Sequence, residues 1–309
     1  LELHRAYRET HERLASLDEA LGREDSRTQT SPWDEVRDFF HYCDNYVDAV
    51  DHAAEHFAGG AGDPRRIRDL AETRLESLGI KVAGTDAGKL RSYDSDSRIL
   101  YLSSRMAPET RTFQMLLQVA LLTQDKLLEA TLDLARFQSE AARSIAKIGL
   151  ANYFAGAALM PYGAFLAAAQ EHRHDLEILA ARFGASIEQV CHRLTTLQRE
   201  GAKGIPFFFL RVDKAGNVTK RFNASSFNLA EHGGACPVWN IHTAFRTPGV
   251  ILPQFVELPE GDRYFTISRT ADRPVFSKDT QDRRVAITLG CELSYADRLI
   301  YTAPFNLAD

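Results

Sequence analysis

The sequence has no apolar run of the roughly 18 residues that a membrane-spanning helix needs. The longest candidate, residues 151–169, is interrupted by Asn152, Pro161 and Gly163. The sequence also shows no secretory signal at its start. These absences argue against an integral membrane protein and against a secreted one.

Cysteine and positive charge are also scarce. Four cysteines in 309 residues are too few for a secreted disulfide scaffold, so we expect a cytoplasmic protein with reduced thiols. The 37 lysines and arginines are outnumbered by 42 aspartates and glutamates, which gives a net charge of −5. An acidic surface repels phosphate backbones, so this chain is a poor candidate for the main nucleic-acid contact.

Helical periodicity dominates the first two thirds of the chain. An amphipathic helix is expected over residues 2–24, and because it begins at Leu1 rather than at a methionine we expect the natural protein to continue upstream. Ser31 and Pro32 supply an N-cap and a first-turn proline for a helix from 32 to 58, which two glycines end. Further helices are expected at about 64–78, 108–134, 137–158, 162–171, 173–183 and 187–198.

Segments with a two-residue period are shorter. Residues 80–82 and 98–102 predict two strands around a polar turn at 93–96. After Gly201 the pattern predicts further strands at 206–212, 218–222, 254–257, 264–268 and 284–289. We therefore predict an α+β chain in three parts: an N-terminal helix and linker (1–31), a mainly helical domain (32–200) and a smaller, mainly β domain (201–309).

Residues 99–165 carry the first specific motif. Leu150-Ala151-Asn152-Tyr153-Phe154-Ala155 and Ala158-Leu159-Met160-Pro161, with the blocks around them, make residues 32–185 resemble the ImmA/IrrE-type metallopeptidase domain, a zincin-like fold. Such an enzyme holds zinc with His-Glu-x-x-His on one helix, where the glutamate is the general base.

This sequence departs from that motif at each functional position. The corresponding stretch reads Leu117-Gln118-Val119-Ala120-Leu121, and Leu150 stands where the resemblance places the third ligand. Leucine has no lone pair for a metal, and glutamine cannot act as a carboxylate base. We expect no peptidase activity.

Nearly the whole chain resembles one family, the short-chain fatty acyl-CoA transcriptional regulators. The blocks that carry the resemblance are 190–197, 204–209, 211–217, 236–240 and 289–293. The resemblance implies an upstream helix-turn-helix DNA-binding domain and a peptidase-like domain that senses CoA or a short acyl-CoA such as propionyl-CoA. It also implies a 4Fe-4S cluster in the cysteine-containing C-terminal region, assembly into a homotetramer, and control of propionate (methylcitrate-cycle) metabolism.

Cys191, Cys236 and Cys291 are the predicted cluster ligands. Glycines directly precede Cys291 and lie just before Cys236, and we expect them to let the backbone approach a bulky cluster. The wide spacing of the three cysteines gives no compact Cys-x-x-Cys signature, and zinc is a competing metal because it also accepts three cysteines and one histidine. His192 is the first candidate for the fourth ligand, although neighbouring helical residues diverge by about 100°. The further candidates, besides a non-protein ligand, are Cys43, His232 and His242.

A second set of residues is expected to bind the acyl-CoA. Aromatic residues are proposed to line an apolar cleft that suits a pantetheine arm; they are Tyr46, Tyr153, Phe154 and Tyr162. The alternative for each is an ordinary core aromatic. Three cations are proposed to bind the phosphates: Arg211, Lys220 and Arg221.

Two other functions compete with the sensor. One is a working metallopeptidase that cleaves a repressor, against which the missing ligands argue. The other is a zinc-binding DNA-binding module, because residues 176–197 resemble a helix-turn-helix; a plain helical hairpin that closes the domain is the simpler interpretation. His172 and His174, just before this hairpin, are expected in solvent at a helix end.

Overall fold

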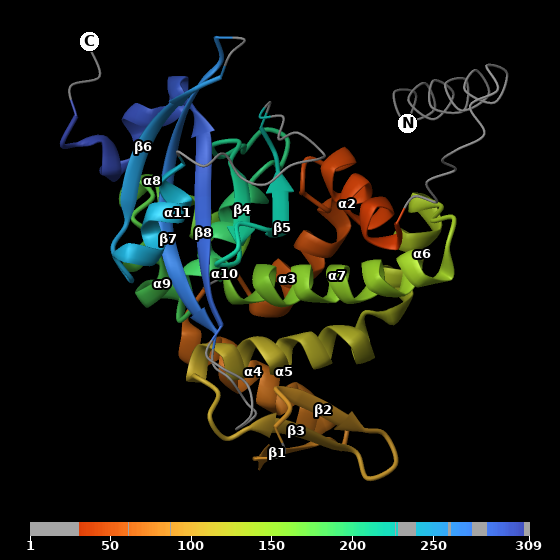
Figure 1. Cartoon of the computed structure of the whole chain (residues 1–309). Helices are drawn as coiled ribbons and strands as arrows, with labels where there is room; N and C mark the ends of the chain where they lie inside the picture. Colours follow the sequence, from red (N-terminus) through yellow and green to blue (C-terminus); the bar gives the residue numbers. More distant parts are fainter. Residues whose placement is uncertain are drawn as a thin grey trace, which may run out of the picture.

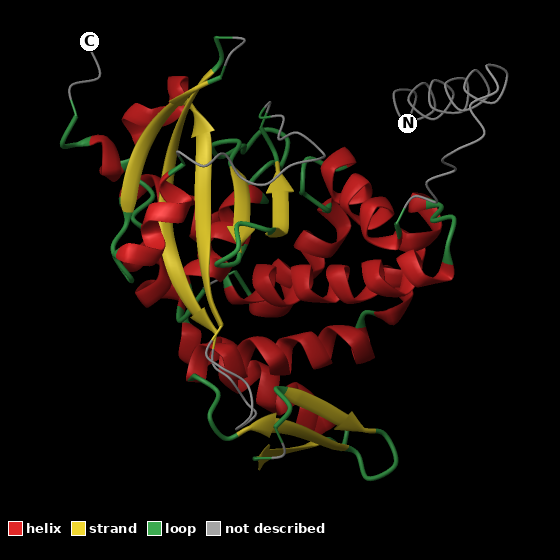
Figure 2. Ribbon diagram, in the orientation of Figure 1, coloured by secondary structure: helices red, strands yellow, loops and turns green. Residues whose placement is uncertain are grey.

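The computed structural model describes residues 31–60, 62–86, 88–225, 227, 239–258, 261–273 and 283–305. Within these ranges the chain has the α+β fold that the sequence predicts, with a helical region followed by a five-stranded antiparallel sheet (Figures 1 and 2). The helix expected over 2–24 lies outside the described residues, as do Cys236 and His232. Among the described helices, none combines the length and the apolar character needed to cross a membrane.

The first described helices begin where the sequence places their caps. Ser31 accepts a hydrogen bond from the backbone at the start of α2 (Pro32–Tyr42), and Asp63 caps α4 (Pro64–Ser77) in the same way. The prediction of a single helix over 32–58 is wrong. Helix α2 ends at Tyr42, and a separate helix, α3 (Asp48–Ala58), begins at Asp48. Asp44 and Asn45 have positive φ in this break, a conformation that Asp and Asn tolerate better than other non-glycine residues.

The remaining helices follow the expected order. The helix expected over 108–134 is two helices, which meet at Gln124. The capping box at Ser186 and Gln189 is present, with both reciprocal hydrogen bonds. These helices are α5 (Pro108–Thr123), α6 (Asp125–Ala135), α7 (Glu140–Leu159), α8 (Tyr162–Glu171), α9 (Leu176–Phe183) and α10 (Ile187–Thr195).

A small sheet precedes α5. β1 (Lys81–Thr85) runs parallel to β3 (Ile99–Ser103), and β2 (Arg91–Asp94) pairs with β3 from the other side. Strand β2 was not predicted from the sequence, because its residues overlap the polar turn expected at 93–96. In Figure 2, α5 lies between this sheet and the long helix α7.

The C-terminal sheet has the strand order β5-β4-β8-β7-β6, with every neighbouring pair antiparallel. Its strands are β4 (Phe208–Val212), β5 (Val218–Asn223), β6 (Leu252–Glu257), β7 (Arg263–Arg273) and β8 (Arg283–Glu292). Helix α11 (Asn240–Thr243) and three short 3-10 segments, η1 (Ala244–Arg246), η2 (Leu293–Arg298) and η3 (Ile300–Thr302), complete this region.

The two faces of this sheet belong to different cores, because side chains alternate along each strand. Phe209, Leu289 and Cys291 face the helices and extend the core of the helical region. Phe208, Tyr264 and Trp239 form a separate cluster on the opposite face. The hydrophobic core is therefore continuous from the helical region into the sheet.

Candidate functional site

Packed side chains fill the positions at which the resemblance to a metallopeptidase places zinc ligands. Leu117 and Leu150 are buried, and Leu121 packs against the same core. Gln118, where the resemblance places the general base, is also buried, and its side-chain oxygen accepts a hydrogen bond from Arg91 of β2. This helix presents an apolar surface and a neutral amide where a peptidase presents imidazoles and a carboxylate.

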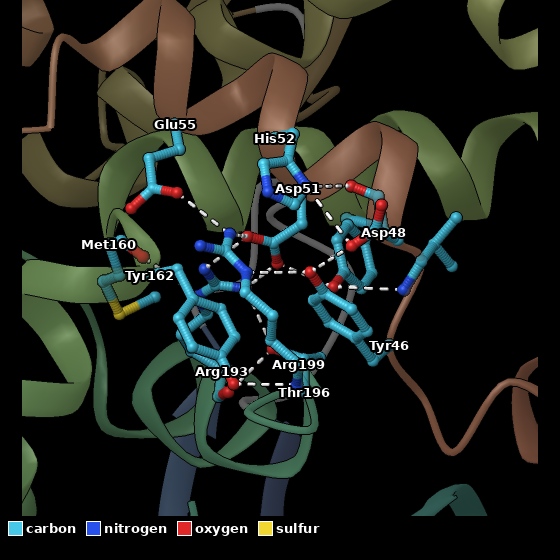
Figure 3. Close-up of polar contacts among 12 residues, drawn as sticks. Tyr46, Asp48, Asp51, His52, Glu55, Met160, Tyr162, Arg193, Thr196 and Arg199 are labelled. Carbon is cyan, nitrogen blue, oxygen red and sulfur yellow. Dashed lines mark hydrogen bonds and ion pairs between the residues drawn. The ribbon is translucent and has the colours of Figure 1, made fainter. Parts of the chain in front are cut away.

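A buried ion pair joins α3 to α10. The guanidinium of Arg193 donates to both carboxylate oxygens of Asp51, at 2.5 Å and 3.2 Å (Figure 3). The Asp51 side chain is fully buried and that of Arg193 is 2% exposed. Arg193 also donates to the backbone carbonyl of Met160 at 2.9 Å, so the pair also ties α10 to the end of α7. Such a geometry offsets the large desolvation cost of two buried charges.

Arg199, which follows α10, completes the group. It donates to Asp51 at 3.2 Å, to Glu55 at 2.9 Å and to the hydroxyl of Tyr46 at 2.9 Å. Its guanidinium carbon lies 4.0 Å from the centre of the Tyr162 ring. We call Tyr46, Asp51, Glu55, Tyr153, Tyr162, Arg193 and Arg199 the Asp51 network.

The charges of the network are balanced. Burial alone would raise the pKa of Asp51, but the charge and hydrogen bonds of Arg193 outweigh it and hold the pKa below its ordinary value. The Tyr153 hydroxyl donates to Asp51 at 2.7 Å, and burial together with that negative charge raises the pKa of Tyr153 far above its usual range. Two guanidiniums face two carboxylates here, so the network carries no net charge.

Three of the four predicted aromatic residues meet in this network. Tyr46, Tyr153 and Tyr162 each make a hydrogen bond within it or to the backbone beside it. Phe154 follows Tyr153 but is fully buried, with its ring 5.9 Å from that of Phe57. Phe154 is thus part of the helical core.

The three predicted cations lie elsewhere, on the β4–β5 hairpin. Arg211 donates to Glu188 of α10 at 2.8 Å. Lys220 is the ladder partner of Arg211, and Arg221 is that of Leu210. The hairpin therefore gathers the cations, whereas the tyrosines project from the helical region.

The two described cysteines among the predicted ligands lie in the layer between α10 and the sheet. Cys191 lines a small apolar cavity with Ile267 and Leu289. Cys291 is two residues beyond Leu289 on β8, so both thiols are on the helix-facing side of the sheet. Burial raises the pKa of both, to about 12 for Cys291. Within the described ranges, no three histidine, cysteine or acidic side chains lie together closely enough to bind a single metal ion.

The structure gives Gly290 a different role from the expected one. A Cβ at this position would lie 2.3 Å from Cζ of Phe208, on the face of the sheet opposite Cys291. The packing of this aromatic ring therefore requires Gly290 whether or not a cluster is bound.

His192 points toward the β4–β5 side of α10. Its ring makes edge contacts with Phe209 and Phe222, at centroid distances of 4.5 Å and 5.1 Å. Its Nε2 lies 3.6 Å from a carboxylate oxygen of Glu188. The other candidates for the fourth ligand within the described ranges are Cys43, just after α2, and His242 of α11.

The charged centre of the Asp51 network was not predicted from the sequence. One signal was available: Asp51 stands on the apolar stripe of α3, among Val47, Val50, Ala54 and Ala58. A charged residue on such a stripe indicates a buried partner. The partners, Arg193 and Arg199, are more than 140 residues away, so no local pattern identifies them.

Two family descriptions match adjoining parts of the chain. Residues 75–195 match the IrrE N-terminal-like domain, and residues 196–309 match the C-terminal region of short-chain fatty acyl coenzyme A regulators. The resemblance of the helical region to ImmA/IrrE-type domains is thereby confirmed.

Several characterised proteins are similar over most of the chain. A propionyl-CoA carboxylase regulator from Cereibacter sphaeroides is 59% identical over 99% of the chain. The regulators RamB and PrpR from Mycobacterium tuberculosis, both described as HTH-type transcriptional regulators, are 38% identical over 99% and 40% identical over 90%. The chain spans 66%, 66% and 58% of these three proteins.

A solved structure agrees in fold as well. A transcriptional regulator from Mycobacterium tuberculosis is 38% identical, with a TM-score of 0.83 over 90% of this chain and 87% of that one. The chain therefore belongs to the short-chain fatty acyl coenzyme A regulator family, with an IrrE-like helical region followed by the C-terminal region of that family.

Proposed function

We propose that this chain is the sensing portion of a transcriptional regulator of short-chain acyl-CoA and propionate metabolism, and that it is not a peptidase. The proposal is supported by the 59% identity to a propionyl-CoA carboxylase regulator and by the buried leucines Leu117 and Leu150 where the resemblance places zinc ligands. Incubation of the purified chain with zinc and an unfolded protein substrate should give no cleavage. Cleavage that a chelator abolishes would overturn this part of the proposal.

The effector of the proposed sensor is CoA or a short acyl-CoA. Because the Asp51 network is charge-balanced, it has no excess positive charge for the phosphates, and we assign these to the hairpin cations Arg211, Lys220 and Arg221. β5, which carries Lys220 and Arg221, is an edge strand of the sheet. The apolar helical side, with Tyr46 and Tyr162, would take the pantetheine arm and acyl group.

Calorimetry with propionyl-CoA tests the effector. We expect binding to the wild-type chain and at least about tenfold weaker binding to the double variant Lys220→Ala/Arg221→Ala, a loss of about 1.4 kcal/mol or more. Arg263→Ala, which removes an exposed cation from β7, is the matched control and should bind like the wild type. An absence of heat with the wild-type chain would remove the effector from the proposal.

The proposed cofactor is a 4Fe-4S cluster held by Cys191, Cys236 and Cys291. Cysteine sulfurs are the usual ligands of iron–sulfur clusters. Cys191 and Cys291 are buried thiols on the same side of the sheet. Their raised pKa values mean that both are neutral thiols without a metal, so a cluster would supply the positive charge that stabilises the thiolates. When bound, the cluster would link α10 to β8 and to the segment that carries Cys236.

Native mass spectrometry of anaerobically purified chain tests cofactor, effector and assembly together. We expect the mass of a cluster, bound CoA and a homotetramer. Cys291→Ser should remove the brown colour and the iron, whereas Cys43→Ser, at the C-terminal end of α2, should retain both. Wild-type protein that is colourless and contains zinc instead would favour the single-ion alternative.

DNA binding is assigned to the portion of such a regulator that this chain does not include. Helix α10 cannot serve as a recognition helix, because residues on both of its sides are buried against α7 and the sheet. A gel-shift experiment with this chain alone should show no retardation of promoter DNA. Retardation would restore residues 176–197 as a DNA-binding candidate.

A further inference from the structure

One half-buried arginine in the helical region has no acidic partner. Arg91, the first residue of β2, donates to the side-chain oxygen of Gln118 on α5 and forms no ion pair within the described residues. Its Nε is buried and has no hydrogen-bond partner in the same part of the chain. Burial lowers the pKa of Arg91, which means that its charged form is disfavoured in the free chain. An uncompensated cation of this kind calls for an anion.

The side chain of Arg91 points toward the helices. Its ladder partner on β3 is Leu102, which is fully buried. Residues directly opposite each other on neighbouring strands project from the same face of a sheet. Arg91 therefore projects from the face that packs on α5, in agreement with its contact with Gln118. The cation lies where the edge of the small sheet meets this helix.

The side of α5 that faces β2 offers hydrogen-bond donors and positive charge. Arg111 and Gln114 precede Gln118 by seven and four residues, so the three side chains lie on one side of the helix. Arg111 and Gln114 are partly exposed, and their side chains make no hydrogen bond or ion pair within the described ranges. A further position of this series, Asp125, begins α6 and already binds Lys147 at 2.7 Å. The surface thus matches a negatively charged ligand.

The backbone of β2 is open to a further strand. In the order β1-β3-β2 it is an edge strand, and no described strand lies beyond it (Figure 1). The backbone N–H of Ser103 donates to the carbonyl of Leu90, and hydrogen-bonded pairs alternate with non-hydrogen-bonded pairs along an antiparallel ladder. The backbone N–H and C=O groups of Arg91 and Tyr93 therefore point away from β3. An extended peptide can pair with them.

The open edge and the unpaired cation coincide at Arg91. A strand added to β2 places the side chain opposite Arg91 with its Cβ about 4.5–5.5 Å away. An aspartate or glutamate at that position reaches the guanidinium, which binds a carboxylate through two parallel hydrogen bonds. A phosphate group would satisfy the charge but has no backbone to pair with β2. A peptide uses both features.

We propose that the edge of β2 binds an extended, acidic peptide segment of another protein, whose carboxylate pairs with Arg91. The peptide backbone pairs with Arg91 and Tyr93, and Arg111 and Gln114 supply further donors to its side chains. The site is independent of the acyl-CoA effector and of the cluster proposed above. It gives the helical region a protein-binding surface that can act alongside a small-molecule sensor.

Fluorescence anisotropy with two labelled peptides tests the site. Both have about eight residues of alternating threonine and valine, with either glutamate or glutamine at the centre. We expect the glutamate peptide to bind the full chain at least about tenfold more tightly than the glutamine peptide, because only glutamate neutralises Arg91. N-methylation of the glutamate peptide at the backbone nitrogens beside the glutamate should abolish binding, because strand pairing needs those donors.

Variants of the chain assign the preference to Arg91. Arg91→Gln should give the two peptides the same affinity, and Arg91→Lys should reduce the preference, since lysine keeps the charge but lacks the planar fork. Arg65→Gln, which removes an exposed arginine from α4, is the matched control and should keep the full preference. A preference that survives in both Arg91 variants would overturn the proposal, as would a wild-type chain that does not bind the glutamate peptide.

Competition separates a peptide from a phosphate ligand. An excess of propionyl-CoA should leave the glutamate peptide bound, because the phosphates are assigned to the β4–β5 hairpin. Displacement of the peptide from the wild-type chain, but not from a Lys220→Ala/Arg221→Ala variant, would place both ligands on the hairpin and overturn the site at β2. Displacement from both chains would show that phosphate is the anion that Arg91 binds, and would overturn the peptide as its ligand.

Discussion

Helix α10 buries an arginine on one side and a cysteine on the other, and the two sides differ in how their polar groups are satisfied. Arg193 faces α3, where Asp51 and the carbonyl of Met160 occupy its donors. Cys191 faces the sheet, where it lines a small cavity among apolar side chains. Residues two apart on a helix point in different directions, so one turn of α10 places Arg193 toward α3 and Cys191 toward the sheet.

The difference indicates two kinds of dependence. On the side of α10 that faces α3, which we call the Asp51 side, the charged groups need no bound ligand, because every charge in the network has a partner of opposite sign. On the side that faces the sheet, which we call the thiol side, burial raises the pKa of Cys191 despite the nearby charge of Arg269, and it also raises the pKa of Cys291. The strongest interactions of these thiols would therefore come from a bound group. We therefore expect the stability of the first side to be independent of iron and that of the second side to depend on it.

The largest effect is expected from Arg193→Ala. Removal of Arg193 leaves the buried Asp51 carboxylate with Arg199 as its remaining cation, and we expect this to cost up to about 3–5 kcal/mol of the free energy of unfolding. Chemical denaturation with and without iron should give the same loss. Arg263→Ala, which breaks an exposed pair with Glu257, should cost less than about 1 kcal/mol. Similar losses in the two variants would contradict the distinction.

Gly290→Ala tests the face of the sheet that is turned away from the two thiols. The added Cβ would meet Phe208, and we expect a loss of about 1–3 kcal/mol in thermal or chemical unfolding. Combination with Phe208→Leu should restore part of that loss. Gly156→Ala is the control, because its Cβ would lie 4.0 Å from Phe113 in ordinary contact. An unchanged stability in Gly290→Ala would show that Phe208 can move aside freely.

The pH dependence of unfolding should reveal the Asp51 side. Because the folded pKa of Asp51 is depressed, its stabilising contribution is present above the ordinary value of 3.8 and is lost as the pH falls through the folded value. The stability difference between the wild type and Asp51→Asn should therefore shrink below about pH 4, by at most about 1.4 kcal/mol per pH unit. A difference that stays constant down to pH 2.5 would argue against the ionised pair.

The smallest effect is expected from Cys191→Ala in iron-free protein. There the thiol acts as a small buried apolar group, and its truncation should cost about 1 kcal/mol. In iron-loaded protein the same substitution should remove the cluster and cost more. Cys43→Ala should give the same result in both preparations. Equal losses for Cys191→Ala with and without iron would remove the distinction between the two sides of α10.

Local patterns in the sequence determined much of this molecule. The caps at Ser31, Asp63 and Ser186, the two-residue period after Gly201 and the apolar stretch 117–121 all depend on residues close together in the chain. Such signals are local because hydrogen-bond caps, side-chain periodicity and metal-ligand spacing act over a few residues.

The tertiary structure decided which of these residues meet. Only the fold brings Asp51 to Arg193, Tyr46 to Arg199 and Phe208 to Gly290, and only the fold turns Cys191 and His192 toward different strands. It also buries His174 beside Phe207, against the expectation of a solvated helix end. The physical reason is that burial and charge pairing depend on distances between segments far apart in sequence, which no local pattern encodes.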